Sequence, residues 1–62
     1  MLYLDMLKAQ IEEYSNKIQF LKTLFNSKSD PGTKTIILMQ IEHAEIHKTS
    51  LNKLVGMFQN AF

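Results

Sequence analysis

The chain has 62 residues and a formal net charge of +1, and it contains no cysteine; all seven of its basic residues are lysines. This length allows one small domain, and the absence of cysteine excludes disulfides and thiolate metal sites. A core of this size supplies only about 3–5 kcal/mol, so unusually good helix packing or a partner subunit is expected. The absence of arginine weakens a nucleic-acid interpretation, because arginine makes the bidentate contacts to phosphates and bases.

Residues 2–26 are predicted to form a first helix. Apolar positions recur there at alternating spacings of three and four, as at the a and d positions of a heptad repeat, and nothing alternates with the period of a strand. This stripe consists of Leu4, Leu7, Ile11, Tyr14, Ile18, Leu21 and Phe25. The helix is expected to end near Phe25 or Asn26, with Asn26 acceptable as a left-handed cap.

A turn is predicted at residues 27–30, within a cluster of turn-forming residues that runs from Asn26 to Gly32. Asp30 followed by Pro31 is typical of a helix N-cap with proline at the first helical position. A second helix is therefore predicted over residues 31–60.

The second helix carries a similar stripe with one lysine in it. Its members are Ile37, Ile41, Ala44, Lys48, Leu51, Val55, Phe58 and Phe62. If the chain folds back on itself, the stripes face each other in pairs whose numbers sum to 62, as Leu21 and Ile41 do. This register places the Tyr14 hydroxyl opposite the Lys48 ammonium. The sequence thus predicts an all-α, antiparallel two-helix hairpin with a coiled-coil-like seam.

The seam leaves many apolar residues unused. Besides Tyr3, they are Leu2, Met6, Phe20, Leu24, Ile36, Leu38, Met39, Ile46, Leu54 and Met57, and these ten form a candidate oligomer or partner interface. They gather near the turn and near the chain ends, on either side of a more polar middle. Two hairpins packed face to face would bury many of them in a four-helix bundle. Two separate contact zones are the alternative interpretation.

His43 and His47 are four residues apart, so they share one helix face at a spacing that can hold a metal. The zinc-protease helix requires Glu directly after the first histidine, where this chain has Ala44. No third ligand is evident, so we interpret them as solvated histidines and predict no metal site. At a subunit contact, they would make assembly sensitive to pH between about 5 and 7.

Nothing in the sequence favours catalysis, so we expect no enzymatic activity and no cofactor. The neighbouring carboxylates of Glu12 and Glu13 do not face each other on a helix. The two glycines, Gly32 and Gly56, stand too far apart for a phosphate loop. Gly56 is interpreted as tolerated near a helix end, with the close approach of another helix as the alternative.

The longest apolar run, Ile36 to Met39, is far shorter than the roughly 20 residues of a membrane span, which favours a cytoplasmic protein with no membrane partner. The abundance of Ile, Lys and Asn suits a bacterial or phage origin. In length and layout the predicted hairpin resembles Rop-type RNA-binding proteins, which dimerise into four-helix bundles. It is also similar in plan to the small co-chaperones that hold needle subunits in type III secretion. No residue motif accompanies either resemblance.

Three hypotheses for the function follow. The first is a small non-enzymatic interaction module, a homodimeric helical bundle that acts as an adaptor, regulator or inhibitor of another protein. The second is an obligate subunit or co-chaperone of a hetero-complex such as a secretion apparatus. The third is a Rop-like dimeric hairpin that binds RNA or DNA through lysines such as Lys8 and Lys22; nucleic acid is the least favoured partner.

Overall fold

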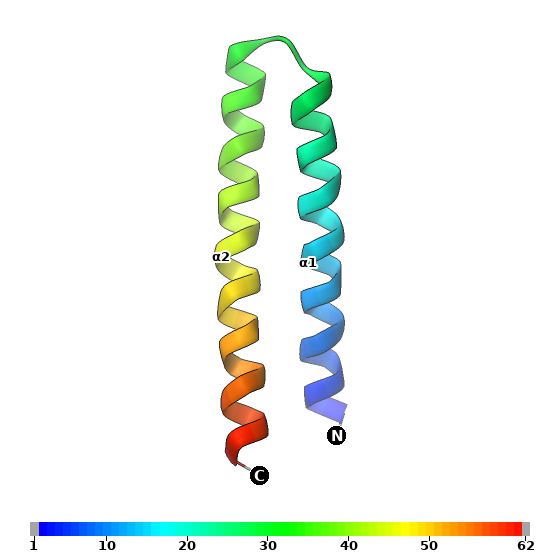
Figure 1. Ribbon diagram of the computed structural model, residues 1–62, viewed down its shortest axis with the longest axis vertical. Coiled ribbons are helices and arrows are strands. Elements are labelled where there is room, and N and C mark those ends of the chain that lie inside the picture. Colours follow the sequence, from blue (N-terminus) through cyan, green and yellow to red (C-terminus); the bar gives the residue numbers. More distant parts are fainter. Residues whose placement is uncertain (1, 62) are drawn as a thin grey trace.

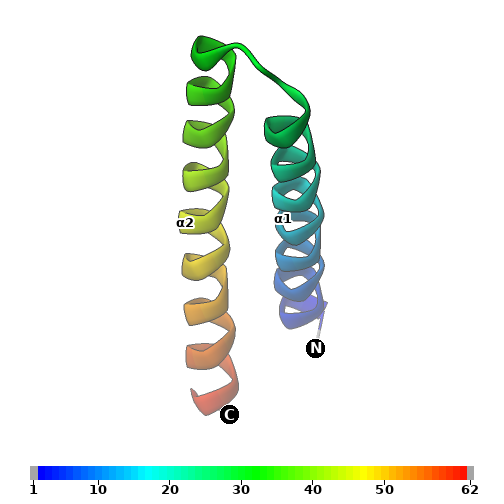
Figure 2. The ribbon, with the colours of Figure 1, turned by 45° about the horizontal axis from the view of Figure 1, so that its top comes forward.

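The computed structural model of the chain describes residues 2–61, which form two helices joined by a short turn (Figure 1). Helix α1 comprises Leu2–Ser27 and helix α2 comprises Pro31–Ala61. They run antiparallel and side by side, so the start of α1 and the end of α2 lie at one end of the molecule and the turn lies at the other (Figure 2). The described part of the chain contains no strand, and the predicted all-α hairpin is confirmed.

Asp30 fixes the start of α2. Its Oδ2 atom accepts hydrogen bonds from the Thr33 hydroxyl at 2.7 Å and from the Thr33 backbone N–H at 2.9 Å. Both bonds favour the charged carboxylate and so lower the pKa of Asp30 below its usual value. The bond from the Thr33 hydroxyl contributes more to this lowering than the bond from the backbone N–H. The Asp30 carbonyl also accepts the Lys34 N–H at 3.0 Å. This is the N-cap that the sequence predicts, with Pro31 at the first helical position.

The end of α1 differs from the prediction. The helix continues through Asn26 to Ser27, and no described residue has a positive φ, so Asn26 does not form the left-handed cap that its residue type allows. The Ser27 hydroxyl instead donates to the Leu24 carbonyl at 2.8 Å, and the Lys28 N–H donates to the Phe25 carbonyl at 3.3 Å. These bonds satisfy carbonyls of the last turn without a left-handed residue.

The seam between the helices is lined by the two apolar stripes. All fourteen predicted seam residues from Leu4 to Phe58 are buried or half-buried, and Phe62 lies outside the described residues. The largest buried cluster consists of Ile18, Leu21, Ile37, Ile41 and Ala44, with Tyr14, Leu24 and Phe25 packed against it. Near the turn, the Lys34 ammonium lies 4.7 Å from the centre of the Phe25 ring. The core is thus one helix–helix interface, covered on neither long side by a third element. Within residues 2–61, neither helix has a stretch that is both long and apolar enough to cross a membrane.

Candidate interaction surface

Two contacts between the helices identify the two long sides of the hairpin. On one side, the Lys22 ammonium lies 3.8 Å from a carboxylate oxygen of Glu45. On the other, the rings of Tyr14 and His47 stack with centroids 5.7 Å apart and planes inclined by 12°. Glu45 directly follows a seam residue and His47 directly precedes one. Because successive helical residues turn by about 100°, these two side chains leave the seam on opposite sides.

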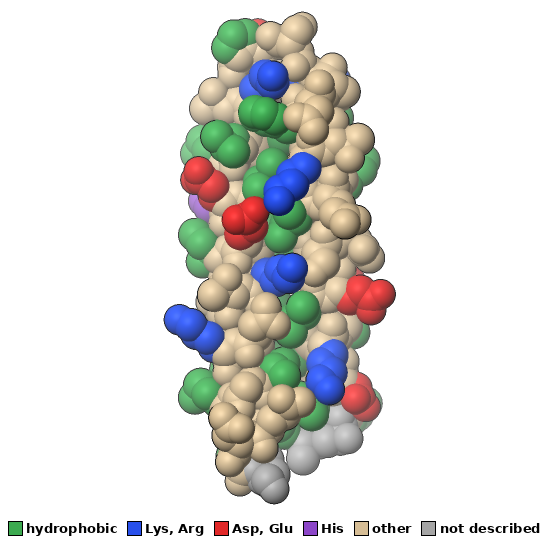
Figure 3. Space-filling view, in the orientation of Figure 1, with side chains coloured by type: hydrophobic (Ala, Val, Ile, Leu, Met, Phe, Trp, Pro, Cys, Tyr) green, Lys and Arg blue, Asp and Glu red, His purple; other side chains and the backbone are tan. Residues whose placement is uncertain are grey.

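The side that carries Lys22 and Glu45 is called the charged flank. Residues three and four apart share a helix face, which extends this flank along both helices. Its positions are Asp5, Lys8, Glu12, Ser15, Gln19 and Lys22 in α1, and Leu38, Glu42, Glu45, Thr49, Asn52, Gly56 and Gln59 in α2. Six of them are charged, and Leu38 is the one exposed large hydrophobic residue among them. Figure 3 shows a charged face of this kind. Lysine side chains lie along the junction of the two helices, and acidic side chains lie beside them.

The side that carries His47 is called the histidine flank. Its positions are Tyr3, Met6, Gln10, Glu13, Lys17, Phe20 and Leu24 in α1, and Ile36, Gln40, His43, His47, Ser50, Leu54 and Met57 in α2. Six of the ten exposed large hydrophobic side chains of the described chain lie here, and Leu24 adds a half-buried one. Glu13 and Lys17 are its two formal charges. The histidine flank is therefore the more apolar side of the hairpin.

The hydrophobic residues of the histidine flank lie at its two ends. Near the turn these are Phe20, Leu24 and Ile36, and near the helix ends these are Tyr3, Met6, Leu54 and Met57. At the helix ends, the Tyr3 ring also packs against the ring of the seam residue Phe58, with a distance of 5.4 Å between the ring centroids. Of the ten residues predicted as an interface, the structure places six on this flank. Leu38 lies on the charged flank, and Leu2, Met39 and Ile46 lie on the sides of the helices that face away from the seam.

The middle of the histidine flank is polar and holds two shallow hollows. One is lined by Gln10, Glu13, Tyr14 and Lys17, and the other by Tyr14, Lys17, Gln40, His43, Ala44 and His47. The predicted contact of the Tyr14 hydroxyl with Lys48 is absent from the hydrogen bonds of residues 2–61; the Tyr14 ring stacks on His47 instead. Tyr14 lies at the edge of the seam, so its ring can extend over the flank. His47 precedes Lys48 by one residue, and its imidazole stacks there on the Tyr14 ring.

Both histidines are exposed. Nowhere in residues 2–61 do three His, Cys, Asp or Glu side chains come together in a group that could hold a metal ion. His43 and His47 therefore form part of the polar middle of this flank, where they line one hollow together with Lys17 and Gln40.

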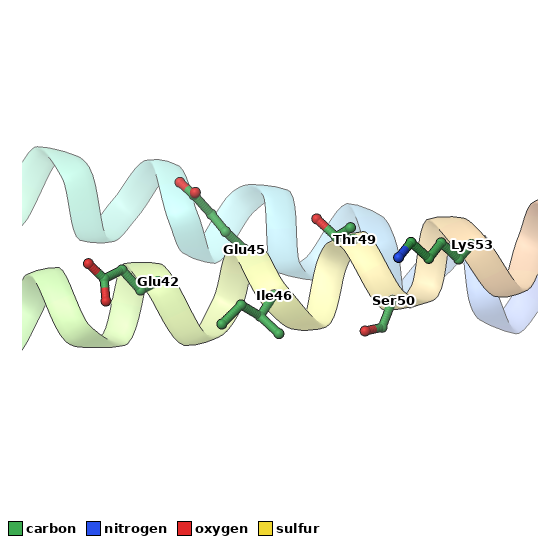
Figure 4. A pocket seen from close by; sticks show the side chains of 6 residues that line it. All are labelled: Glu42, Glu45, Ile46, Thr49, Ser50 and Lys53. Carbon is green, nitrogen blue, oxygen red and sulfur yellow. The ribbon is translucent and has the colours of Figure 1, made fainter.

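A further hollow, of about 500 Å³, lies on the side of α2 that faces away from α1, between the two flanks. It is lined by Glu42, Glu45, Ile46, Thr49, Ser50 and Lys53. Figure 4 shows that these side chains all come from one helix, are spread along it and point in different directions. A ligand pocket usually encloses its ligand with a few convergent polar groups. A hollow walled by a single helix offers no such enclosure, so it is a weaker candidate site than the histidine flank.

No protein-family model matches the chain, and neither a curated protein nor a solved structure is significantly similar to it.

Proposed function

We propose that this chain is a small protein–protein interaction module that assembles as a homodimeric four-helix bundle and acts as an adaptor, regulator or inhibitor of another protein. The observation that supports this function is the imbalance between buried and exposed hydrophobic residues. Within residues 2–61, six hydrophobic residues are buried, whereas ten large hydrophobic side chains are exposed. Exposed apolar surface on this scale is typical of a surface that another protein covers.

The geometry of the seam supports the same proposal. Each seam residue is covered by the opposite helix alone, and most of the seam outside the largest buried cluster is only half-buried. Most helical stability in proteins comes from the tertiary packing of an amphipathic face, which two helices provide on one side only. A second hairpin would cover the seam from a flank and convert it into the centre of a four-helix bundle, whose helices pack with this same heptad spacing.

The molar mass in solution tests the proposal. We expect light scattering on a size-exclusion column to give twice the chain mass of 7.2 kDa at micromolar concentrations and above, with high helicity by circular dichroism. A stable, highly helical monomer at every concentration, with no binding of a hydrophobic dye, would contradict the proposal. If the chain alone is a poorly helical monomer and becomes helical only when co-expressed with another protein, it is an obligate subunit of a hetero-complex and not a homodimer.

The charged flank gives little support to a nucleic-acid partner. Its lysines, Lys8 and Lys22, share the flank with four acidic residues, Asp5, Glu12, Glu42 and Glu45. Phosphate backbones are bound by surfaces with a clear excess of positive charge. A mobility shift with structured RNA or duplex DNA that weakens steeply with salt would favour the nucleic-acid function over the proposed one.

A further inference from the structure

We infer that a second copy of this chain covers the histidine flank, and that the charged flank stays free. This inference rests on the proposed homodimer and specifies its contact surface. Three features of the histidine flank support it: its area, the order of its apolar and polar residues along the hairpin, and its charge.

The area of the flank fits a partner as large as the hairpin itself. The Cα atoms span 48 Å by 14 Å in the two longest directions of the molecule, an envelope of about 670 Å². Stable interfaces bury about 800 Å² on each partner, and side chains widen the Cα envelope toward that value. A single short helix or an extended peptide would cover only part of it. A second hairpin of the same length and width covers both rows of the flank at once.

The order of residues along the flank makes it self-complementary. Apolar residues lie at both ends, and polar residues lie between them. A two-fold axis parallel to the helices brings Phe20 and Ile36 of one copy to the turn end of the other. An axis across the helices brings the same residues to Met6 and Leu54. Either dimer therefore places apolar ends on apolar ends and polar middle on polar middle, as an isologous interface requires.

The charges favour the same flank. The histidine flank carries one acidic and one basic residue, Glu13 and Lys17, so two copies bring no net like charge together. The charged flank carries four acidic residues and two lysines, so two copies packed through it would bring twelve charged side chains into one contact surface. Charged residues are depleted at interface centres, because their burial costs free energy.

A dimer formed through the histidine flank leaves other apolar residues uncovered. Leu38 on the charged flank, and Met39 and Ile46 on the outer side of α2, would stay exposed. They lie on α2 at positions that a second copy does not reach. The remaining surface of the dimer is therefore one on which a different protein can bind.

The chain contains three pairs of identical residues that test this assignment. One member of each pair lies on the histidine flank and the other lies off it, with nearly the same exposed fraction. These fractions are 60% for Ile36 and 62% for Ile46, 52% for Met6 and 53% for Met39, and 44% for Leu54 and 45% for Leu38. The test variant combines Met6→Gln, Ile36→Gln and Leu54→Gln. The control variant combines Met39→Gln, Ile46→Gln and Leu38→Gln, and so loses the same side chains and gains the same amides.

We expect the test variant to raise the dissociation constant of the dimer by at least about a hundredfold, because three apolar contacts are lost in each copy. The control variant is expected to dimerise like the unchanged chain. Light scattering across a concentration series measures both. If the unchanged chain is a monomer, the proposed homodimer is wrong. If the control substitutions weaken the dimer as much as the test substitutions do, the homodimer remains supported but the assignment of its contact surface is wrong.

A second measurement covers the case in which the test variant loses its helicity. The chain has no cysteine, so single thiols can be introduced by Gln40→Cys on the histidine flank and Asn52→Cys on the charged flank. Both positions are exposed amide side chains of α2, and Gln40 lines the same hollow as His43 and His47. We expect dimerisation to slow alkylation of the thiol in the Gln40→Cys variant and to leave that in the Asn52→Cys variant unchanged. Equal alkylation of the two thiols in the dimer would overturn the inference.

Discussion

The half of the hairpin near the turn is better packed than the half near the helix ends. The turn half contains the buried cluster of Ile18, Leu21, Ile37, Ile41 and Ala44. In the other half, Leu7 is the one buried residue among those described, and the remaining seam residues are half-buried. One feature of α2 contributes to this difference: Lys48 occupies a seam position, and its ammonium group must reach water.

A second copy would contribute most to the half near the helix ends. The turn half is stabilised within one chain, by its core cluster and by the Asp30 cap. The half near the helix ends has less of both, yet it carries four of the exposed apolar side chains of the histidine flank, among them Tyr3 and Met57. The dimer proposed above would therefore add proportionally more burial to the weaker half.

The largest effect is expected for Leu21→Ala in the turn half. Leu21 is 5% exposed and belongs to the core cluster. Truncation of a buried leucine typically costs about 2–5 kcal/mol, since a cavity remains where the side chain was. That cost is comparable to the whole stability expected of a domain this small. We expect strong loss of helicity at 25 °C by circular dichroism; a variant that melts like the unchanged chain would show that the cluster contributes little.

Leu51→Ala makes the same change in the half-buried seam of the other half. We expect a smaller cost, about 1–2 kcal/mol, because less apolar area is lost. The measurement is thermal melting at low and high protein concentration. The cost should grow with concentration, since a second copy covers the seam there. An effect equal to that of Leu21→Ala at all concentrations would break the contrast between the two halves.

Gly56→Ala tests the backbone of the weaker half. A Cβ atom at Gly56 would meet nothing within 4 Å, and the residue lies inside α2. Replacing a helical glycine by alanine then stabilises by about 0.5–1 kcal/mol through the entropy of the unfolded chain. We expect a higher melting temperature and an unchanged dimer. Weaker association in this variant would support the alternative in which another helix approaches closely at Gly56.

The smallest effect is expected at the Asp30 cap in the turn half, and it depends on pH. Because the pKa of Asp30 is lowered in the folded chain, its cap stabilises the fold above the ordinary value of 3.8, and this contribution is lost as the pH falls through the lowered pKa. Asp30→Asn keeps a side-chain oxygen for Thr33 but cannot titrate. We expect both chains to melt alike near neutral pH, and the unchanged chain to lose more stability below about pH 3.8; identical acid profiles would contradict this.

Local sequence signals predicted most of the fold. The stripes through Ile18 and Ile41, and the Asp30–Pro31 start of α2, depend on residues three or four apart or on neighbours. The end of α1 was less predictable, because Ser27 and Lys28 satisfy the last carbonyls with ordinary φ angles. The sequence indicated the surplus apolar residues but not that most of them share one flank. In α1, polar residues separate the apolar flank positions Met6 and Phe20, so these positions do not form a continuous apolar stripe in the sequence. Contacts between the helices, such as Tyr14–His47, show that they share one side of the hairpin.

The antiparallel course of the chain places the start of α1 and the end of α2 at the same end of the molecule (Figure 1). A peptide linker that fuses two copies in tandem therefore reports their relative orientation. If the copies lie with their turns together, a linker of a few residues joins them. If they lie with turns at opposite ends, the linker must bridge up to the 48 Å length of the hairpin, which takes about 14 extended residues. The shortest linker that gives a stable single-chain bundle thus distinguishes the two orientations.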